Sequence, residues 1–244
     1  QRLRRQWWRR RRRFRITPEQ LPRAGTADAT FVVRDNRRHT DDIERSYRAA
    51  IRAARKRIVI ANAYFFPGYR FIKELRNAAR RGVEVHLILQ GEPDMPFVKR
   101  AAEMLYHYML RAGVCIHEYC ERPLHGKVAV IDDDWSTVGS SNLDPMSLSF
   151  NLEANVFIRD RGFAQVLTAN LDQLMRASCR EITAQGLGTL AGWPLLQSVL
   201  AYHLTRYYPK WALWLPRHVP RLLPAVANTK PVAPAFVMAA KEKG

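Results

Sequence analysis

Residues 124–145 read LHGKVAVIDDDWSTVGSSNLDP and combine a histidine, a lysine and a hydroxyl-rich turn. His125 and Lys127 are two residues apart, Asp132 follows five residues later, and Gly139 begins the run GSSN. Alternate side chains of a strand share a face, so the imidazole and the ammonium group are expected on the same side. An imidazole with one unprotonated nitrogen can attack phosphorus, and a neighbouring lysine can bind the phosphoryl oxygens. This spacing therefore indicates phosphodiester chemistry.

Three further polar residues near this run could complete a phosphate site. Ser140 offers a hydroxyl at a tight strand end, and Asn142 adds a side-chain donor. Glu153 opens the stretch EANVF, where a carboxylate has little structural reason to stand. This acid, or an equivalent one, could accept a hydrogen bond from the imidazole and so fix its tautomer. Because the lysine supplies positive charge and the chain offers no separate carboxylate cluster, we predict neither a metal nor a cofactor.

From about residue 27 onward, apolar runs alternate with helical patterns, and this order predicts the elements that position the site. Strands are predicted at residues 31–33, 57–66, 83–89, 114–119, 127–132, 135–140 and 153–158, and helices after Thr40 or Asp41, from Phe71 to Gly82 and at 97–112. Strand–helix alternation followed by consecutive strands predicts one α/β module, a sandwich with a mixed sheet. Asn62, Tyr64 and Phe66 end the second predicted strand, whose tip we expect near the site, so they are candidate substrate contacts.

Charge and composition divide the 244 residues into three segments. A net charge of +18 favours anionic partners, either nucleic acid or acidic lipid. Residues 1–26, with nine arginines before Ile16, are predicted to be a linker or membrane-contact segment, and residues 27–181 to be the catalytic module. Residues 182–244 form a basic, aromatic, proline-interrupted tail that is free of acids before Glu242. This tail is typical of a bilayer interface, and the alternative is a tail packed on the module itself.

The remaining compositional signals concern redox state and membrane spans. Three cysteines without a CxxC pair disfavour a disulfide framework or a zinc site and fit a reducing compartment. No uninterrupted apolar run reaches about 18 residues, so no membrane span is predicted.

The motif His125-x-Lys127-x-x-x-x-Asp132, followed by GSSN and Glu153, resembles the signature of the phospholipase D superfamily. The segments NAYFFPGYRF, LILQGEPDMP and GSSNLDPMSLSFNLEANV are similar to the second half of bacterial cardiolipin synthases, most of all those of the B type. The similarity runs from about residue 27 into the tail. It implies a phospholipase D-like α-β-α sandwich in which His125, Lys127 and Asp132 are catalytic and Ser140, Asn142 and Glu153 bind or orient phosphate.

The resemblance also implies a two-step transfer. A histidine attacks a phosphatidyl phosphodiester, a phosphohistidine forms, and an alcohol then takes the phosphatidyl group. Because that chemistry uses two motifs and this chain has one, the second comes either from a missing N-terminal half or from a homodimer partner. The first residue, Gln1, favours the missing half. The expected partners are phosphatidylglycerol and an anionic membrane surface, at the cytoplasmic side of a bacterial inner membrane.

Three functions compete at this point. The leading hypothesis is a phosphatidyltransferase that makes cardiolipin from two phosphatidylglycerols. A phospholipase D-type phosphodiesterase or endonuclease, acting on nucleic acid as a homodimer, would also use the basic charge. A non-enzymatic module that only supports its partner and binds membrane is the third. The aromatic, acid-free tail disfavours the nuclease, and the intact set of motif residues disfavours the support module.

Overall fold

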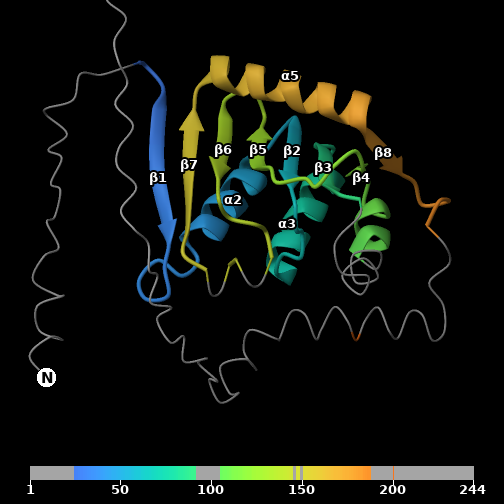
Figure 1. Cartoon of the computed structure of the whole chain (residues 1–244), viewed down its shortest axis with the longest axis horizontal. Coiled ribbons are helices and arrows are strands. Elements are labelled where there is room, and N and C mark those ends of the chain that lie inside the picture. The colour runs from blue at the N-terminus through green and yellow to red at the C-terminus, as the bar shows by residue number, and fades with distance from the viewer. Residues whose placement is uncertain (1–24, 92–104, 145–146, 149–150, 188–199, 201–244) are drawn as a thin grey trace, which may run out of the picture.

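A computed structural model describes residues 25–91, 105–144, 147–148, 151–187 and 200, which form a single sheet with helices on both faces (Figure 1). The strands are β1 (Asp28–Arg34), β2 (Arg57–Asn62), β3 (Glu84–Gln90), β4 (Val114–Tyr119), β5 (Lys127–Ile131), β6 (Trp135–Gly139), β7 (Glu153–Arg159) and β8 (Cys179–Ile182). The helices are α2 (Asp42–Ala53), α3 (Tyr69–Arg80) and α5 (Arg161–Ser178), and residues 105–110 are also helical. Residues 1–24 of the predicted segment 1–26, the start of the helix predicted at 97–112 and nearly all of the tail lie outside these residues.

The eight strands are ordered β1-β7-β6-β5-β2-β3-β4-β8. The pairs β2–β3 and β3–β4 are parallel, and every other neighbouring pair is antiparallel. The helix α3 connects β2 to β3, as a parallel crossover requires. The prediction of an α/β sandwich with a mixed sheet is confirmed.

Alternation along the strands sends apolar side chains to two separate cores. In β2, Ile58 and Ile60 pack with α2 and α3, whereas Val59 and Ala61 pack with α5. All four side chains are at most 2% exposed. Burying an isoleucine side chain contributes about 1.5–3 kcal/mol, so the central strands anchor both layers. A run that is apolar throughout is typical of a strand covered on both faces.

The strand predicted over residues 57–66 is too long, because β2 ends at Asn62. The chain then leaves the β2 ladder. Phe65 forms an isolated bridge with Leu143, and the N–H of Phe66 donates to the carbonyl oxygen of Leu143 at 2.7 Å. An apolar run by itself does not reveal where pairing stops. The consequence is that the segment after β2 is tied to the segment after GSSN.

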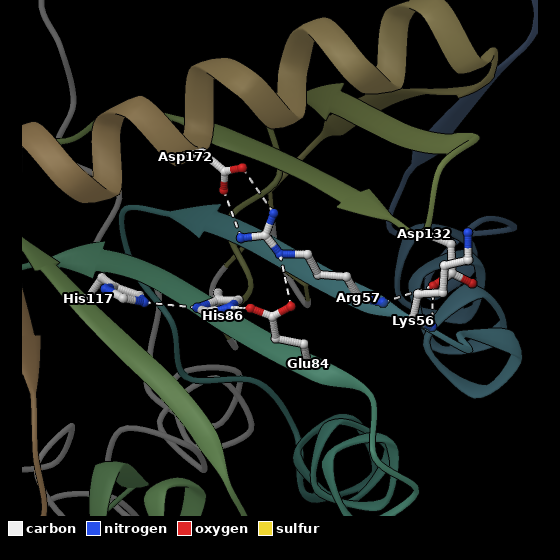
Figure 2. A network of polar contacts seen from close by, with 7 residues as sticks. All are labelled: Lys56, Arg57, Glu84, His86, His117, Asp132 and Asp172. Carbon is white, nitrogen blue, oxygen red and sulfur yellow. Dashed lines mark hydrogen bonds and ion pairs between the residues drawn. The ribbon is translucent and has the colours of Figure 1, made fainter.

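A polar network joins α5 to the end of the sheet at which β2 and β3 begin (Figure 2). Arg57 donates two hydrogen bonds to Asp172 of α5, at 3.0 and 2.7 Å, and lies 3.6 Å from Glu84. Glu84 contacts His86 at 2.6 Å, and the other nitrogen of that ring lies 3.0 Å from Nε2 of His117. The network therefore fixes α5 against three neighbouring strands.

This network predicts an acid-sensitive fold. Burial, and then the neighbouring His86, lower the pKa of His117 from its ordinary value of 6.5. The unfolded chain then binds the proton more readily, so the free energy of unfolding falls as the pH drops below about 6.5 and is unaffected by this group at higher pH. His117→Gln should flatten that decline, measured by urea unfolding at about pH 7.5 and about pH 5.5. His39→Gln, at an exposed histidine, is the control. An unchanged decline in His117→Gln would contradict the prediction.

Candidate active site

The end of the sheet at which β5 begins brings His125 and Lys127 together. Lys127 is the first residue of β5 and pairs with Asn62, the last residue of β2. Its Nζ lies 3.4 Å from Nδ1 and 3.3 Å from Nε2 of His125, and it donates to the His125 carbonyl oxygen at 3.2 Å. Nearly equal distances to both ring nitrogens mean that the ammonium group lies along neither lone pair. This ring is exposed, so a substrate or a further protein group can approach it.

The lysine of this pair is held at the sheet end in a desolvated position. Lys127 is only 6% exposed. Burial lowers the pKa of its ammonium group, while the carboxylates of Glu153 and Asp144 act in the opposite direction. A buried cation next to an exposed imidazole is suited to bind the oxygens of a phosphodiester.

Ser140 and Glu153 form the second part of the site, where β6 ends and β7 begins. The hydroxyl of Ser140 donates to the Glu153 carboxylate and accepts from the N–H of Ala154 at 3.1 Å, and the N–H of Ser140 donates to the Ala154 carbonyl oxygen at 2.9 Å. Glu153 is 9% exposed. Among the residues that the structure describes, neither ring nitrogen of His125 is hydrogen-bonded to Glu153. The Glu153 carboxylate is thus held by Ser140 and does not orient the His125 imidazole.

Gly139 is required by the close approach of β7. A Cβ at this position would lie 2.3 Å from Cγ and Oδ1 of Asn155 and 2.5 Å from the carbonyl oxygen of Ala154. Asn155, only 1% exposed, is fixed from behind by a 3.2 Å bond from its Nδ2 to Oγ1 of Thr137. Glycine therefore lets β6 and β7 converge so that Ser140 reaches Glu153.

Arg34 is a site residue that sequence reasoning missed. It ends β1, pairs in register with Glu153, and is 3% exposed. Its guanidinium donates to the carbonyl oxygen of Asn151, to Oδ1 of Asn36 at 2.7 Å and to the carbonyl oxygen of Thr40 at 3.3 Å. The buried cation holds the segment that leads into Glu153. The only local signal was an arginine at the end of an apolar strand, and such a residue is ordinarily exposed.

The three candidate substrate contacts after β2 lie in different surroundings. Asn62 is fully buried, and its Oδ1 accepts from the N–H of Leu143 at 3.2 Å, so it fastens the GSSN segment to β2. Phe66 is 7% exposed and belongs to the core beneath α2 and α3. Tyr64 is 36% exposed and is the member of the three that lies at the surface. Asn142 is half-buried, and its Oδ1 has no hydrogen-bond partner in the described structure.

Asp132 is not part of this cluster. It follows the last residue of β5, so it lies roughly 16 Å from Lys127 at about 3.3 Å per strand residue. Its carboxylate accepts from the backbone N–H groups of Arg55 at 3.0 Å, Lys56 at 2.8 Å and Arg57 at 3.0 Å, where β2 begins (Figure 2). The structure therefore does not bring Asp132 together with His125, and a catalytic role for Asp132 stays a prediction. The side chain instead fixes the turn before β2 at the opposite end of the sheet.

Asp132→Ala should consequently destabilise the fold and leave the site chemistry intact. Three backbone N–H groups would lose their acceptor, and alanine would take the left-handed conformation that Asp132 adopts at φ 53°. We expect a loss of about 2 kcal/mol in unfolding free energy by urea titration. Asp133→Ala, at an exposed neighbour that pairs with Lys56, should change it little. A variant of Asp132 with full stability and no activity would instead support a catalytic role.

The assembled groups fit phosphoryl or phosphatidyl transfer without a bound metal being required. They comprise an accessible imidazole, a buried ammonium group beside it, and a carboxylate held by a serine hydroxyl. In the described part of the chain, no group of three or more His, Cys, Asp or Glu residues is placed to hold a metal ion.

Solved structures of the same fold support this architecture. Nuc from Salmonella typhimurium, a phospholipase D family member, aligns with a TM-score of 0.55 at 20% identity, over 65% of this chain and 100% of that chain. The phosphatidylserine synthase of Haemophilus influenzae Rd KW20 aligns with a TM-score of 0.58 at 13% identity, over 79% of this chain and 48% of that chain. At these identities the likeness establishes the phospholipase D-like fold alone.

Proteins of similar sequence identify the family to which the chain belongs. Cardiolipin synthase B of Escherichia coli (strain K12) is 53% identical over 218 residues, which cover 89% of this chain and 52% of the relative. The chain therefore spans about half the length of the curated relatives it matches. The family model described as cardiolipin synthase, PLD-like domain, matches residues 47–175, just over half of the chain. On this match, which includes His125, Lys127, Ser140 and Glu153, the chain belongs to the cardiolipin synthase, phospholipase D-like domain family.

Proposed function

We propose that this chain supplies one of two catalytic motifs of a phosphatidyltransferase that joins two phosphatidylglycerols into cardiolipin and releases glycerol. The observation that carries the proposal is the 53% identity to cardiolipin synthase B over 89% of the chain. The placement of Lys127 against His125 supports it, because the site holds a nucleophile and a phosphate-binding cation together.

In the first step, an imidazole nitrogen attacks the phosphorus of one phosphatidylglycerol. The bond from phosphorus to the headgroup glycerol oxygen breaks, and that oxygen takes a proton from a second imidazole. The product is a phosphatidyl-histidine and free glycerol. Lys127 binds the phosphoryl oxygens and stabilises the negative charge that develops on them.

In the second step, the headgroup hydroxyl of another phosphatidylglycerol attacks the phosphatidyl-histidine. The second imidazole, now neutral, accepts the hydroxyl proton, the phosphorus–nitrogen bond breaks, and cardiolipin is formed. His125 and its counterpart thus divide the roles of nucleophile and general acid, which one histidine cannot perform together.

The remaining residues orient and bind. Glu153 makes no hydrogen bond to His125. Its role in this proposal is therefore to orient the imidazole that the second motif supplies. Ser140 holds that carboxylate, Asn142 donates to phosphate, and Tyr64 contacts the headgroup. Asp132 and the buried Asn62 and Phe66 maintain the fold.

The second motif comes, in this proposal, from another module of the same fold, preferably the other half of a longer protein and otherwise a second copy of this chain. The half-length match to the relatives supports the first arrangement. We place the protein peripherally on the cytoplasmic face of a bacterial inner membrane, where phosphatidylglycerol and its anionic charge lie. No helix in the portion of the chain that the structure describes is long and apolar enough to cross a bilayer.

The test is to incubate the protein expressed from its complete gene with phosphatidylglycerol vesicles and to quantify lipid and glycerol. We expect cardiolipin and glycerol in equal amounts. Phosphatidic acid and glycerol alone would identify water as the acceptor, and no lipid product would overturn the proposal. Residues 1–244 by themselves should be inactive as a strict monomer, because one histidine is present at the site. Sedimentation of the same sample establishes its oligomeric state.

A further inference from the structure

The connection from β4 to β5 carries His125 and crosses the sheet. Because β2 and β3 lie between these two strands, residues 120–126 pass the ends of both (Figure 1). Most of the connection is exposed, and Leu124 and Gly126 are half-buried. Leu124 packs with the core beneath α5, one residue before His125. The position of the His125 backbone therefore depends on how Leu124 is held on one side and Lys127 on the other.

Gln90 is the residue that holds Leu124. It is the last residue of β3, and its Oε1 accepts a hydrogen bond from the N–H of Leu124. Among the backbone N–H groups of residues 120–126, this is the one that the described structure bonds to the sheet. Arg122 also donates, from Nε to the hydroxyl of Tyr119 at 3.1 Å, but at the beginning of the connection. The Gln90 contact is therefore the one that fixes the connection next to the histidine.

The backbone around Gln90 is itself held firmly. Gln90 pairs in register with Tyr119 of β4, and the N–H of Gly91 donates to the carbonyl oxygen of Tyr119 at 2.9 Å. A Cβ at Gly91 would lie 2.5 Å from Sγ of Cys120 and 3.1 Å from the same carbonyl oxygen. The end of β3 is thus closely packed against the start of the connection, so the amide oxygen of Gln90 is presented from a fixed backbone.

Asn62 makes the corresponding contact on the neighbouring strand. It ends β2, and its Oδ1 accepts from the N–H of Leu143, the residue after Asn142. Because β2 and β3 are parallel neighbours, both side-chain amides lie at the sheet end that carries the candidate site. Two amides therefore fix the two segments of the site, one beside His125 and the other beside Asn142.

We propose that Gln90 is a positioning residue, which orients His125 by holding the N–H of Leu124. Attack at phosphorus requires the reacting atoms at about 3–3.5 Å in a fixed direction, and a shift of about 1 Å can lower turnover about 100-fold. Lys127 is held in the β5 ladder and Ser140 by Glu153, so the phosphate-binding groups do not depend on this contact. The inference rests on the proposed function, because it takes His125 to act at phosphorus.

The test compares two substitutions of Gln90 in the protein expressed from its complete gene. Gln90→Leu removes the acceptor, whereas Gln90→Glu keeps an oxygen acceptor at the same position. We expect Gln90→Leu to lower kcat for cardiolipin formation at least about tenfold, with KM for phosphatidylglycerol within about threefold. Gln90→Glu should keep kcat within about threefold. Gln173→Leu, the same change at an exposed glutamine of α5, should leave kcat and KM unchanged.

Hydrogen exchange measures the contact without turnover. In a peptide that spans residues 120–126, the amide of Leu124 should exchange slowly in the unchanged protein and in Gln90→Glu, and rapidly in Gln90→Leu. Normal turnover by Gln90→Leu, unchanged exchange at Leu124, or an equal loss of kcat in Gln90→Glu would overturn the inference and leave the proposed function standing. Failure of the unchanged protein to make cardiolipin would overturn both.

Discussion

His125→Ala should lower cardiolipin formation by more than about 10⁴-fold, because it removes a group that forms or protonates the bond at phosphorus. The unfolding free energy should change by less than about 0.5 kcal/mol, since the ring is exposed and its only polar side-chain contact in the described structure is Lys127. Product formation by mass spectrometry and urea unfolding on one preparation measure both effects.

The matched control for this loss is His39→Ala. His39 is also an exposed histidine, in the turn before α2, where its Nδ1 contacts Asp42 at 2.6 Å. Removing it should leave turnover within about twofold of the unchanged protein, an energy difference of under 0.5 kcal/mol. If His125→Ala instead lost stability in proportion to activity, the imidazole would be a structural residue. Normal turnover by a well-folded His125→Ala would exclude it from the chemistry.

Gly139→Ala should damage both the fold and the site. The added methyl group would lie 2.3 Å from Asn155 and 2.5 Å from a backbone oxygen of β7, and the backbone cannot give way as a flexible side chain could. Overpacking of this kind costs about 2–3 kcal/mol. Separating β6 from β7 would also move Ser140 away from Glu153, so we expect turnover of the folded fraction to fall by about 100-fold.

Gly68→Ala is the corresponding control, because a Cβ there would meet nothing within 4 Å. Its φ of −61° is open to alanine. Thermal unfolding and turnover per folded molecule should remain close to those of the unchanged protein. Equal damage by both substitutions would show that the effect at Gly139 does not come from contact with β7.

The residues that we propose as catalytic lie at one end of the sheet, and a structural network lies at the other. At one end lie the exposed His125 with the buried Lys127, and Ser140 with the buried Glu153. At the other end, the Asp132 carboxylate accepts hydrogen bonds from the turn before β2, including the N–H of Arg57, and the Arg57 side chain donates to Asp172 of α5 (Figure 2). The five residues of β5 join these ends, so the motif spans the sheet from the site to its structural anchor.

The sequence by itself determined what depends on near neighbours in the chain. The spacing of two residues was enough to predict His125 beside Lys127, although His125 precedes the first residue of β5. The order of apolar runs was enough to predict a mixed sheet. The tight strand end at GSSN was recognisable locally, and so was the acid in EANVF, which has little structural reason to stand there. The resemblance to the phospholipase D superfamily rested on these residues together with the motif of His125, Lys127 and Asp132. Fold class and family were confirmed because these signals are local and periodic.

The tertiary structure alone decided which distant residues meet. Arg34 lies beside Glu153 because β1 pairs with β7, Asn62 holds Leu143 across 81 residues, and Asp132 holds the turn before β2 across 75 or more. Strand register sets these contacts, and register depends on pairing partners that no local pattern names. The spacing within the motif could not show that Lys127 and Asp132 lie at opposite ends of a strand. A residue's place in a motif follows from local sequence, whereas its neighbours in space follow from the fold.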